Sequence, residues 1–229
     1  MAGANSPTSA VTVGRINLMS WTTAPVTLSL PGVVGRLNEA QAGLVVDGDF
    51  YIVGRSADLV CSAGLAFGCS PVDSGSATDA FLSRMRWDNG SIVNEWLYRF
   101  PDLNNSNESG GAIAADGTST LYVGGRTEGS LCGNPTTCSM STTAPTVPMS
   151  KGYVYKVGLT TSKAISSVAL FAELENDTLA PDRSTTVIAL AVVQKGPNGS
   201  SALAIGGVMG GGKDHSTKGN ACHQEPFDL

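Results

Sequence analysis

The stretches Val46-Asp-Gly-Asp-Phe-Tyr51-Ile-Val-Gly54-Arg-Ser and Ala115-Asp-Gly-Thr-Ser-Thr-Leu-Tyr122-Val-Gly-Gly125-Arg-Thr share one pattern. In each, an Asp-Gly pair is followed by a short apolar segment with a tyrosine, which ends on glycine. The tyrosines are 71 residues apart. Asp-Gly favours tight hairpin turns, and alternating apolar segments favour strands, so the pattern predicts a repeated β unit.

Two further features extend the repeat. Cys61 and Cys132 are also 71 residues apart, so the cysteine belongs to the repeated unit. A third, weaker copy is found at Ala202-Leu-Ala-Ile205-Gly-Gly207-Val208, where Gly207 follows Gly125 by 82 residues. Loop insertions explain the longer step.

Turn residues divide each copy into four short strands. In the first copy these are Gly43 to Asp47, Phe50 to Arg55, Phe81 to Trp87 and Ile92 to Phe100, with a hairpin turn at Asp88-Asn89-Gly90. In the second copy they are Ala112 to Asp116, Leu121 to Arg126, Tyr153 to Leu159 and Ala164 to Phe171. Val13 to Trp21 and Val26 to Leu30 are interpreted as the outer strands of a preceding unit, and Glu173 to Leu179 as a helical turn.

Four antiparallel strands per unit predict an all-β chain, specifically a β-propeller of four-stranded blades. Most blades have about 40–50 residues, so the 24-residue segment Ser56 to Asp79 and the 25-residue segment Thr127 to Lys151 are expected as long loops. About three blades are expected, so the ring is incomplete. A linear β-solenoid is the alternative, which the unequal repeat lengths disfavour.

All parts are assigned to one propeller domain. The expected divisions are residues 1–37 for outer strands of a preceding blade, 38–108 for the blade with the Cys61/Cys69 loop, 109–182 for the blade with the Cys132/Cys138 loop, and 183–229 for a partial blade and Gly-rich tail.

The repeated residues resemble a secreted and cell-surface family of β-propeller repeats. The unit of that family reads Asp-x-x-Gly-x-x-Tyr-Val-x-Gly, then Asp-Ala-Phe-Val-x-Lys and an Asp-x-x-Gly turn. Here it stands as Asp47-Gly-Asp-Phe-Tyr-Ile-Val-Gly54, Asp79-Ala-Phe-Leu-Ser-Arg84 and Asp88-Asn-Gly90, and the resemblance covers about Gly43 to Val208. The second copy lacks the Asp before the aromatic residue. The resemblance implies an extracellular scaffold, adhesion or binding role.

Composition excludes several classes of function. The chain has 14 Lys and Arg against 19 Asp and Glu, with no basic run, so neither a nucleic acid nor an anionic membrane surface is expected as a partner. The longest apolar run, Val187 to Val193, is far shorter than the ~18 residues of a membrane span. Met1 to Ala10 has no apolar core of a signal peptide.

The five cysteines form two close pairs and one remainder. This spacing predicts disulfides Cys61–Cys69 and Cys132–Cys138, with Cys222 unpaired within the chain, and an oxidising compartment. Zinc binding with His215 and His223 is the alternative, but the cysteine spacings are longer than those of zinc sites. Cys222 lies where a third cysteine loop is expected to begin. We therefore expect a fragment of a longer chain, or a ring completed by other chains.

Five Asn-x-Ser/Thr sequons point to the same compartment. They begin at Asn89, Asn104, Asn107, Asn176 and Asn198. All five fall in expected turns or loops, where a glycan is tolerated. The sequence therefore predicts an extracellular or cell-surface glycoprotein.

Candidate chemistry is weighed against simpler interpretations. Asp47, Asp49 and Asp116 could bind calcium, but hairpin turns explain them without a metal. Converging carboxylates of a glycoside hydrolase would come from Asp47, Glu95, Asp116 and Asp182. Stacking on sugars in a lectin-like protein would use Trp21, Trp87 and Trp96. Gly210 to Lys213 lacks the spacing of a phosphate loop and is expected to be a flexible tail.

The sequence thus favours a non-enzymatic structural or adhesive glycoprotein that assembles with other protein chains or with further blades. No catalytic, metal or cofactor-binding residue is assigned. A carbohydrate-binding propeller is the first alternative and a propeller glycoside hydrolase the second.

Overall fold

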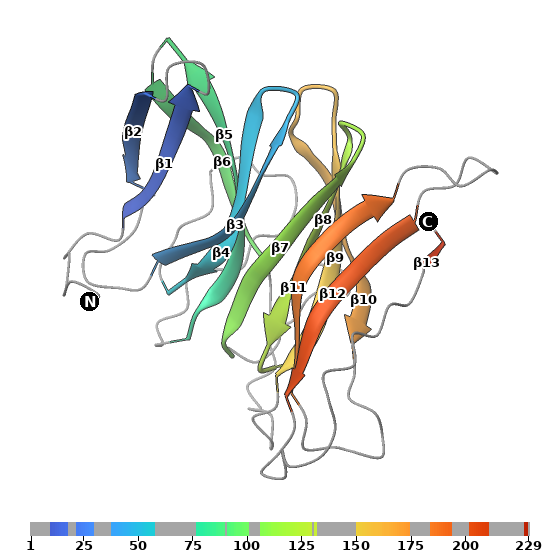
Figure 1. Cartoon of the computed structure of the whole chain (residues 1–229). Coiled ribbons are helices and arrows are strands. Elements are labelled where there is room, and N and C mark those ends of the chain that lie inside the picture. The colour runs from blue at the N-terminus through green and yellow to red at the C-terminus, as the bar shows by residue number, and fades with distance from the viewer. Residues whose placement is uncertain are drawn as a thin grey trace, which may run out of the picture.

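The computed structural model shows an all-β protein (Figure 1). It describes residues 10–17, 22–29, 38–57, 77–89, 91–100, 106–129, 131, 150–174, 184–193, 202–210 and 227–228. Every regular element in these ranges is a strand. In the same ranges, no helix has the length and apolar character needed to cross a bilayer.

The strands form four antiparallel sheets. The first contains β1 (Ala10–Asn17) and β2 (Thr22–Ser29). The second contains, in spatial order, β3 (Asn38–Val46), β4 (Asp49–Ser56), β5 (Asp79–Asp88) and β6 (Ser91–Arg99). The third contains β7 (Glu108–Asp116), β8 (Thr120–Thr127), β9 (Lys151–Leu159) and β10 (Ile165–Leu174). The fourth contains β11 (Ser184–Val193), β12 (Ala202–Gly210) and β13 (Phe227–Asp228).

The prediction of two four-stranded antiparallel sheets is therefore confirmed, and each of their eight predicted strands overlaps an observed one. The helical turn predicted at Glu173 is wrong for Glu173 and Leu174, which belong to β10. These two residues extend the strand because their backbone pairs with Tyr153 and Gly152 of β9.

The hairpin turns follow from residues that tolerate a positive φ. Asp47 and Gly48 have φ values of 51° and 82° and join β3 to β4 directly. Asn89, with φ 46°, lies between β5 and β6. These are the Asp-Gly and Asn-Gly pairs from which the sequence predicted turns.

A β-bulge recurs at the same place in all three larger sheets. The register shifts on the first strand of each sheet, between Ala40 and Ala42, between Gly110 and Ala112, and between Val187 and Ala189. Opposite each bulge the second strand carries glycine, namely Gly54, Gly125 or Gly207. A Cβ atom there would overlap a carbonyl oxygen of the first strand. The glycine of the sequence repeat is thus required by close backbone approach at the bulge.

Side-chain alternation along the strands buries both faces of the two complete sheets. On β4, Tyr51 and Val53 pack toward β7–β10, whereas Ile52 joins an apolar cluster on the opposite face. On β8, Tyr122 packs toward β11 and β12, where it joins the cluster that contains Val187. Each of these two sheets is therefore buried on both faces, as expected for a sheet that lies between other layers.

The junctions between neighbouring sheets repeat one backbone hydrogen bond. The amide of Glu108, which begins β7, donates to the carbonyl of Thr78 just before β5 at 2.6 Å. The amide of Thr185 on β11 donates to the carbonyl of Ser150 just before β9 at 2.7 Å. In addition, the first strands of the three larger sheets, β3, β7 and β11, lie side by side, while the other strands fan outward (Figure 1).

Candidate functional site

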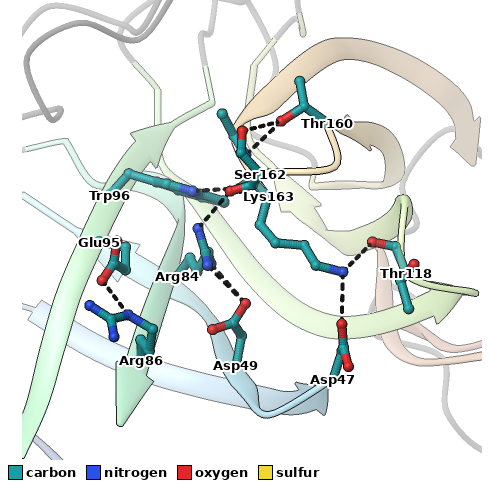
Figure 2. A network of polar contacts seen from close by, with 11 residues as sticks. Asp47, Asp49, Arg84, Arg86, Glu95, Trp96, Thr118, Thr160, Ser162 and Lys163 are labelled. Atoms are coloured by element: carbon teal, nitrogen blue, oxygen red, sulfur yellow. Dashed lines mark hydrogen bonds and ion pairs between the residues drawn. The ribbon is translucent and has the colours of Figure 1, made fainter. Parts of the chain in front are cut away.

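A polar network joins the second and third sheets (Figure 2). The hairpin between β9 and β10 reaches the surface formed by β4, β5 and β6. The turn is fixed internally, since the Thr160 amide donates to the Ala164 carbonyl at 2.8 Å and the Lys163 amide donates to the Thr160 carbonyl at 2.9 Å. A rigid turn can present its carbonyl oxygens to the neighbouring sheet.

Arg84 on β5 is the centre of this network. Its Nε and Nη2 atoms lie 3.0 and 2.9 Å from Oδ2 of Asp49 on the paired strand β4. Its Nη1 donates to the carbonyl of Ser162 at 3.3 Å. Both charged side chains are nearly buried, so the ion pair is stronger than an exposed one.

Lys163 completes the connection from the turn. Its φ of 63° is unusual for a residue with a side chain. Its carbonyl accepts a hydrogen bond from Nε1 of the buried Trp96 at 3.0 Å. Its Nζ donates to the carbonyl of Thr118 at 3.1 Å and lies 3.3 Å from Oδ2 of Asp47. One residue thus links three separate turns and strands.

The charged groups of the network stabilise contacts within the protein. Burial raises the pKa of the neighbouring Tyr51 hydroxyl to about 12, partly offset by the charge of Arg84. Tyr51 therefore stays protonated through the physiological range and cannot serve as a base there. The carboxylates of Asp47 and Asp49 face cations of the protein itself.

Two of the four carboxylates considered for a hydrolase have cationic partners within the protein. Asp47 Oδ2 lies 3.3 Å from Lys163 Nζ, and Glu95 on β6 accepts a hydrogen bond from Arg86 Nε at 2.8 Å (Figure 2). Asp116 ends β7. Asp182 lies outside the described residues. Among the described residues no group of three or more His, Cys, Asp or Glu side chains could hold a metal ion.

Two of the three tryptophans considered for sugar stacking are described, and both pack against apolar clusters of the protein. Trp96 is 6% exposed and packs in the core with Tyr51, at a ring-centroid distance of 6.2 Å. Trp87 packs against the apolar cluster on the other face of the sheet. Trp21 lies outside the described residues.

The predicted modification sites are described only in part. Asn89 is exposed in the β5–β6 turn. Asn107 is also exposed, and its Nδ2 donates to Glu128 Oε2 at 2.8 Å. The other predicted sites lie outside the described residues, namely Asn104, Asn176, Asn198, Cys61, Cys69, Cys132, Cys138 and Cys222.

Sequence reasoning missed two residues that are central to the polar network, Arg84 and Lys163. Arg84 was visible as the basic residue that ends the Asp79 to Arg84 motif, and pairing of β4 with β5 would have placed it opposite Tyr51. Lys163 gave no signal, since it lies 116 residues beyond its partner Asp47 and reaches it only through the folded arrangement of two turns.

The described residues define an all-β protein built from antiparallel four-stranded sheets. No family model matches the sequence, and no curated protein resembles it significantly.

Proposed function

We propose that this chain is a non-enzymatic β-propeller scaffold of an extracellular or cell-surface glycoprotein, acting through assembly with other protein chains or further blades. The observation that carries the proposal is the repeated junction, in which the same backbone hydrogen bond and an apolar layer join successive sheets. Sheets that repeat around closely spaced first strands are the arrangement of propeller blades.

The polar network supports a structural role. Its carboxylates neutralise Arg84 and Lys163, and its carbonyl groups accept hydrogen bonds from neighbouring sheets. A catalytic carboxylate pair would instead face a shared substrate position. The buried position of Trp96 likewise disfavours the lectin-like alternative.

The compartment is supported by the cysteine pairs and the sequons. Asn89 offers a direct test because it lies exposed in a hairpin turn, where a glycan can be accommodated. The full chain should be produced in a glycosylating secretory host and analysed by non-reducing peptide mass spectrometry, before and after removal of N-glycans.

We expect a glycan on Asn89 and the bridges Cys61–Cys69 and Cys132–Cys138. Asn89→Gln should remove one glycan mass, whereas Asn94→Gln, outside any sequon, should leave the glycan mass unchanged. Free thiols and an unmodified Asn89 would contradict the proposed compartment. An experimental structure with a linear solenoid or a closed two-layer sandwich would contradict the propeller.

A further inference from the structure

We infer that Asn107 fastens the chain just after β8 to both complete sheets, and that the folded protein closes the sequon of Asn107 to glycosylation. The part that concerns glycosylation rests on the proposed glycoprotein. Of the two sequons whose asparagines the structure describes, it assigns the glycan to the one at Asn89.

The side chain of Asn107 forms hydrogen bonds through both of its polar atoms. Its Oδ1 accepts a hydrogen bond from the amide of Thr78, just before β5, at 3.1 Å. Its Nδ2 donates to Oε2 of Glu128, just after β8, at 2.8 Å. Its backbone carbonyl accepts a hydrogen bond from the Glu128 amide at 3.0 Å. Asn107 therefore connects the second sheet with the point where the chain leaves the third.

The residues around Asn107 are held by further hydrogen bonds. Oε1 of the buried Glu108 accepts hydrogen bonds from the hydroxyl groups of Ser106 at 2.7 Å and Thr127 at 2.8 Å. The Thr127 hydroxyl also accepts one from the amide of Gly129 at 2.9 Å. Because these bonds share their groups, local opening around Asn107 would break several of them together, which makes opening unfavourable.

The serine of the same sequon lies inside a strand. N-glycosylation recognises an asparagine together with the Ser or Thr two positions later. Here that residue is Ser109 of β7, which is 7% exposed and pairs with Arg126 of β8. The carbonyl of Ser109 accepts a hydrogen bond from the buried hydroxyl of Tyr153 at 3.0 Å. A glycosylating enzyme therefore reaches this sequon only if the start of β7 leaves its sheet.

The sequon at Asn89 has different surroundings. Asn89 lies exposed in the turn between β5 and β6. Its side chain has no hydrogen bond to another residue in the described part of the chain. Hairpin ends also open more readily than strands that are packed between sheets. Asn89 is therefore the accessible acceptor of the two.

The chemistry of glycosyl transfer makes the same distinction. With a nucleotide sugar as donor, the asparagine Nδ2 forms a bond to C1 of the sugar. The bond from C1 to the diphosphate breaks, and Nδ2 loses one proton. In Asn107 this nitrogen already donates to the Glu128 carboxylate, so a sugar on it would compete with the contact that fastens the chain after β8.

The test compares the two sequons in the purified full chain, made in a bacterial host without N-glycosylation. The probe is an asparagine glucosyltransferase with UDP-glucose, and the products are counted by peptide mass spectrometry. Peptides 85–95 and 105–112 contain one sequon each and give the reference rates. We expect Asn89 to react in the folded chain at nearly the rate of its peptide. Asn107 should react at least about tenfold more slowly than its peptide, because it reacts only in locally opened molecules.

Glu128→Ala tests the contact itself. It should raise the rate at Asn107 in the folded chain and speed hydrogen exchange at the Thr78 amide, with unchanged far-ultraviolet circular dichroism. Glu95→Ala is the matched control, since it removes a carboxylate that accepts a hydrogen bond elsewhere, and it should change neither quantity.

Two results would overturn the assignment. If Asn107 in the folded wild type reacted as fast as its peptide, the sequon would not be closed. If Glu128→Ala left both the rate and the exchange unchanged, Asn107 would not fasten the chain through Glu128. Neither result depends on the natural compartment, because both sites meet the same enzyme in vitro. An unmodified Asn89 in protein from a secretory host would contradict the proposed glycoprotein and leave the fastening role of Asn107 intact.

Discussion

The sheets β3–β6 and β7–β10 share strand order, bulge and junction, yet they place opposite charges at one equivalent site. In the first sheet Asp79 on the third strand forms an ion pair with Arg99 on the fourth, and both side chains are 1% exposed. In the second sheet Lys151 holds the place of Asp79 and lies 3.3 Å from Glu173, with 36% and 28% of the side chains exposed. The equivalence is set by register, because Arg99 pairs with Phe81 and Glu173 with Tyr153.

A second difference concerns the basic residue on the third strand, three positions after Phe81 in the first sheet and after Tyr153 in the second. Arg84 in the first sheet binds Asp49 and the turn of the next sheet. Its counterpart Lys156 is exposed, 5.9 Å from the centre of the Tyr122 ring. The two copies therefore share the backbone geometry and differ in the polar side chains. The repeat constrains bulges and apolar layers, while each junction has its own polar contacts.

The largest effect is expected from breaking the buried ion pair. Asp79→Ala leaves the buried guanidinium of Arg99 without its counter-charge, which should lower the free energy of unfolding by about 3–5 kcal/mol. Urea unfolding followed by tryptophan fluorescence measures the change. Leu82→Ala, a truncation on the same strand, is the control for loss of packing without loss of charge. Adding Arg99→Met should recover part of the unfolding free energy lost in Asp79→Ala, because the buried charge is then removed. The same addition should not recover the loss in Leu82→Ala. If Asp79→Ala lowered the free energy of unfolding by less than about 1 kcal/mol, the pair would contribute no more than an exposed salt bridge, which would contradict the prediction.

The shared bulge gives the next effect and should behave alike in both sheets. Gly54→Ala and Gly125→Ala force a Cβ into the carbonyl oxygens of Glu39 and Ser109, so each should cost about 1–3 kcal/mol or more in unfolding free energy. Gly43→Ala is the control, because its Cβ would make only ordinary contacts at 3.5 Å. Thermal unfolding compares the three variants. If either bulge variant were as stable as Gly43→Ala, that glycine would not be required by the fold.

The sequence predicted the features that depend on local backbone chemistry. Asp47-Gly48 and Asn89 gave the hairpins, and the glycine spacing gave equivalent second strands, because positive φ and close backbone approach restrict which residues are allowed. It did not predict the pair of Asp79 and Arg99, whose meeting depends on register across two strands. It also listed Asp47 and Glu95 among the carboxylates of a possible hydrolase, because the separation of two carboxylates on different strands cannot be read from sequence.

Tyr51 and Tyr122, which hold equivalent positions in the two sheets, should contribute differently to the loss of stability at alkaline pH. Burial raises the pKa of Tyr51 to about 12 and also raises that of Tyr122, where the charge of Asp116 adds to burial. The unfolded chain releases these protons near pH 10, so the stabilisation they give is present below about pH 10 and is lost as pH rises through the folded-state pKa. Tyr51→Phe should therefore flatten the fall in stability between about pH 10 and pH 12 more than Tyr122→Phe does.

At neutral pH the Tyr51→Phe change should be within about 1 kcal/mol, because the Tyr51 hydroxyl is buried and has no hydrogen-bond partner among the described residues. Urea midpoints measured at steps from neutral to about pH 12 test the pair of variants. Equal alkaline slopes for both variants and the wild type would contradict titration of these tyrosines as a cause of alkaline destabilisation.

The smallest effect is expected at the exposed counterpart of the buried pair. Lys151→Ala removes a partner from Glu173, but water solvates the remaining carboxylate, so the unfolding free energy should fall by only about 0–1 kcal/mol and the loss should shrink at high salt. Urea unfolding at low and high salt measures it, with Lys156→Ala as a control that removes an exposed lysine without breaking this pair. A loss as large as that of Asp79→Ala, insensitive to salt, would mean that burial does not distinguish the two sites. The charge reversal between the copies would then reflect two equally strong pairs.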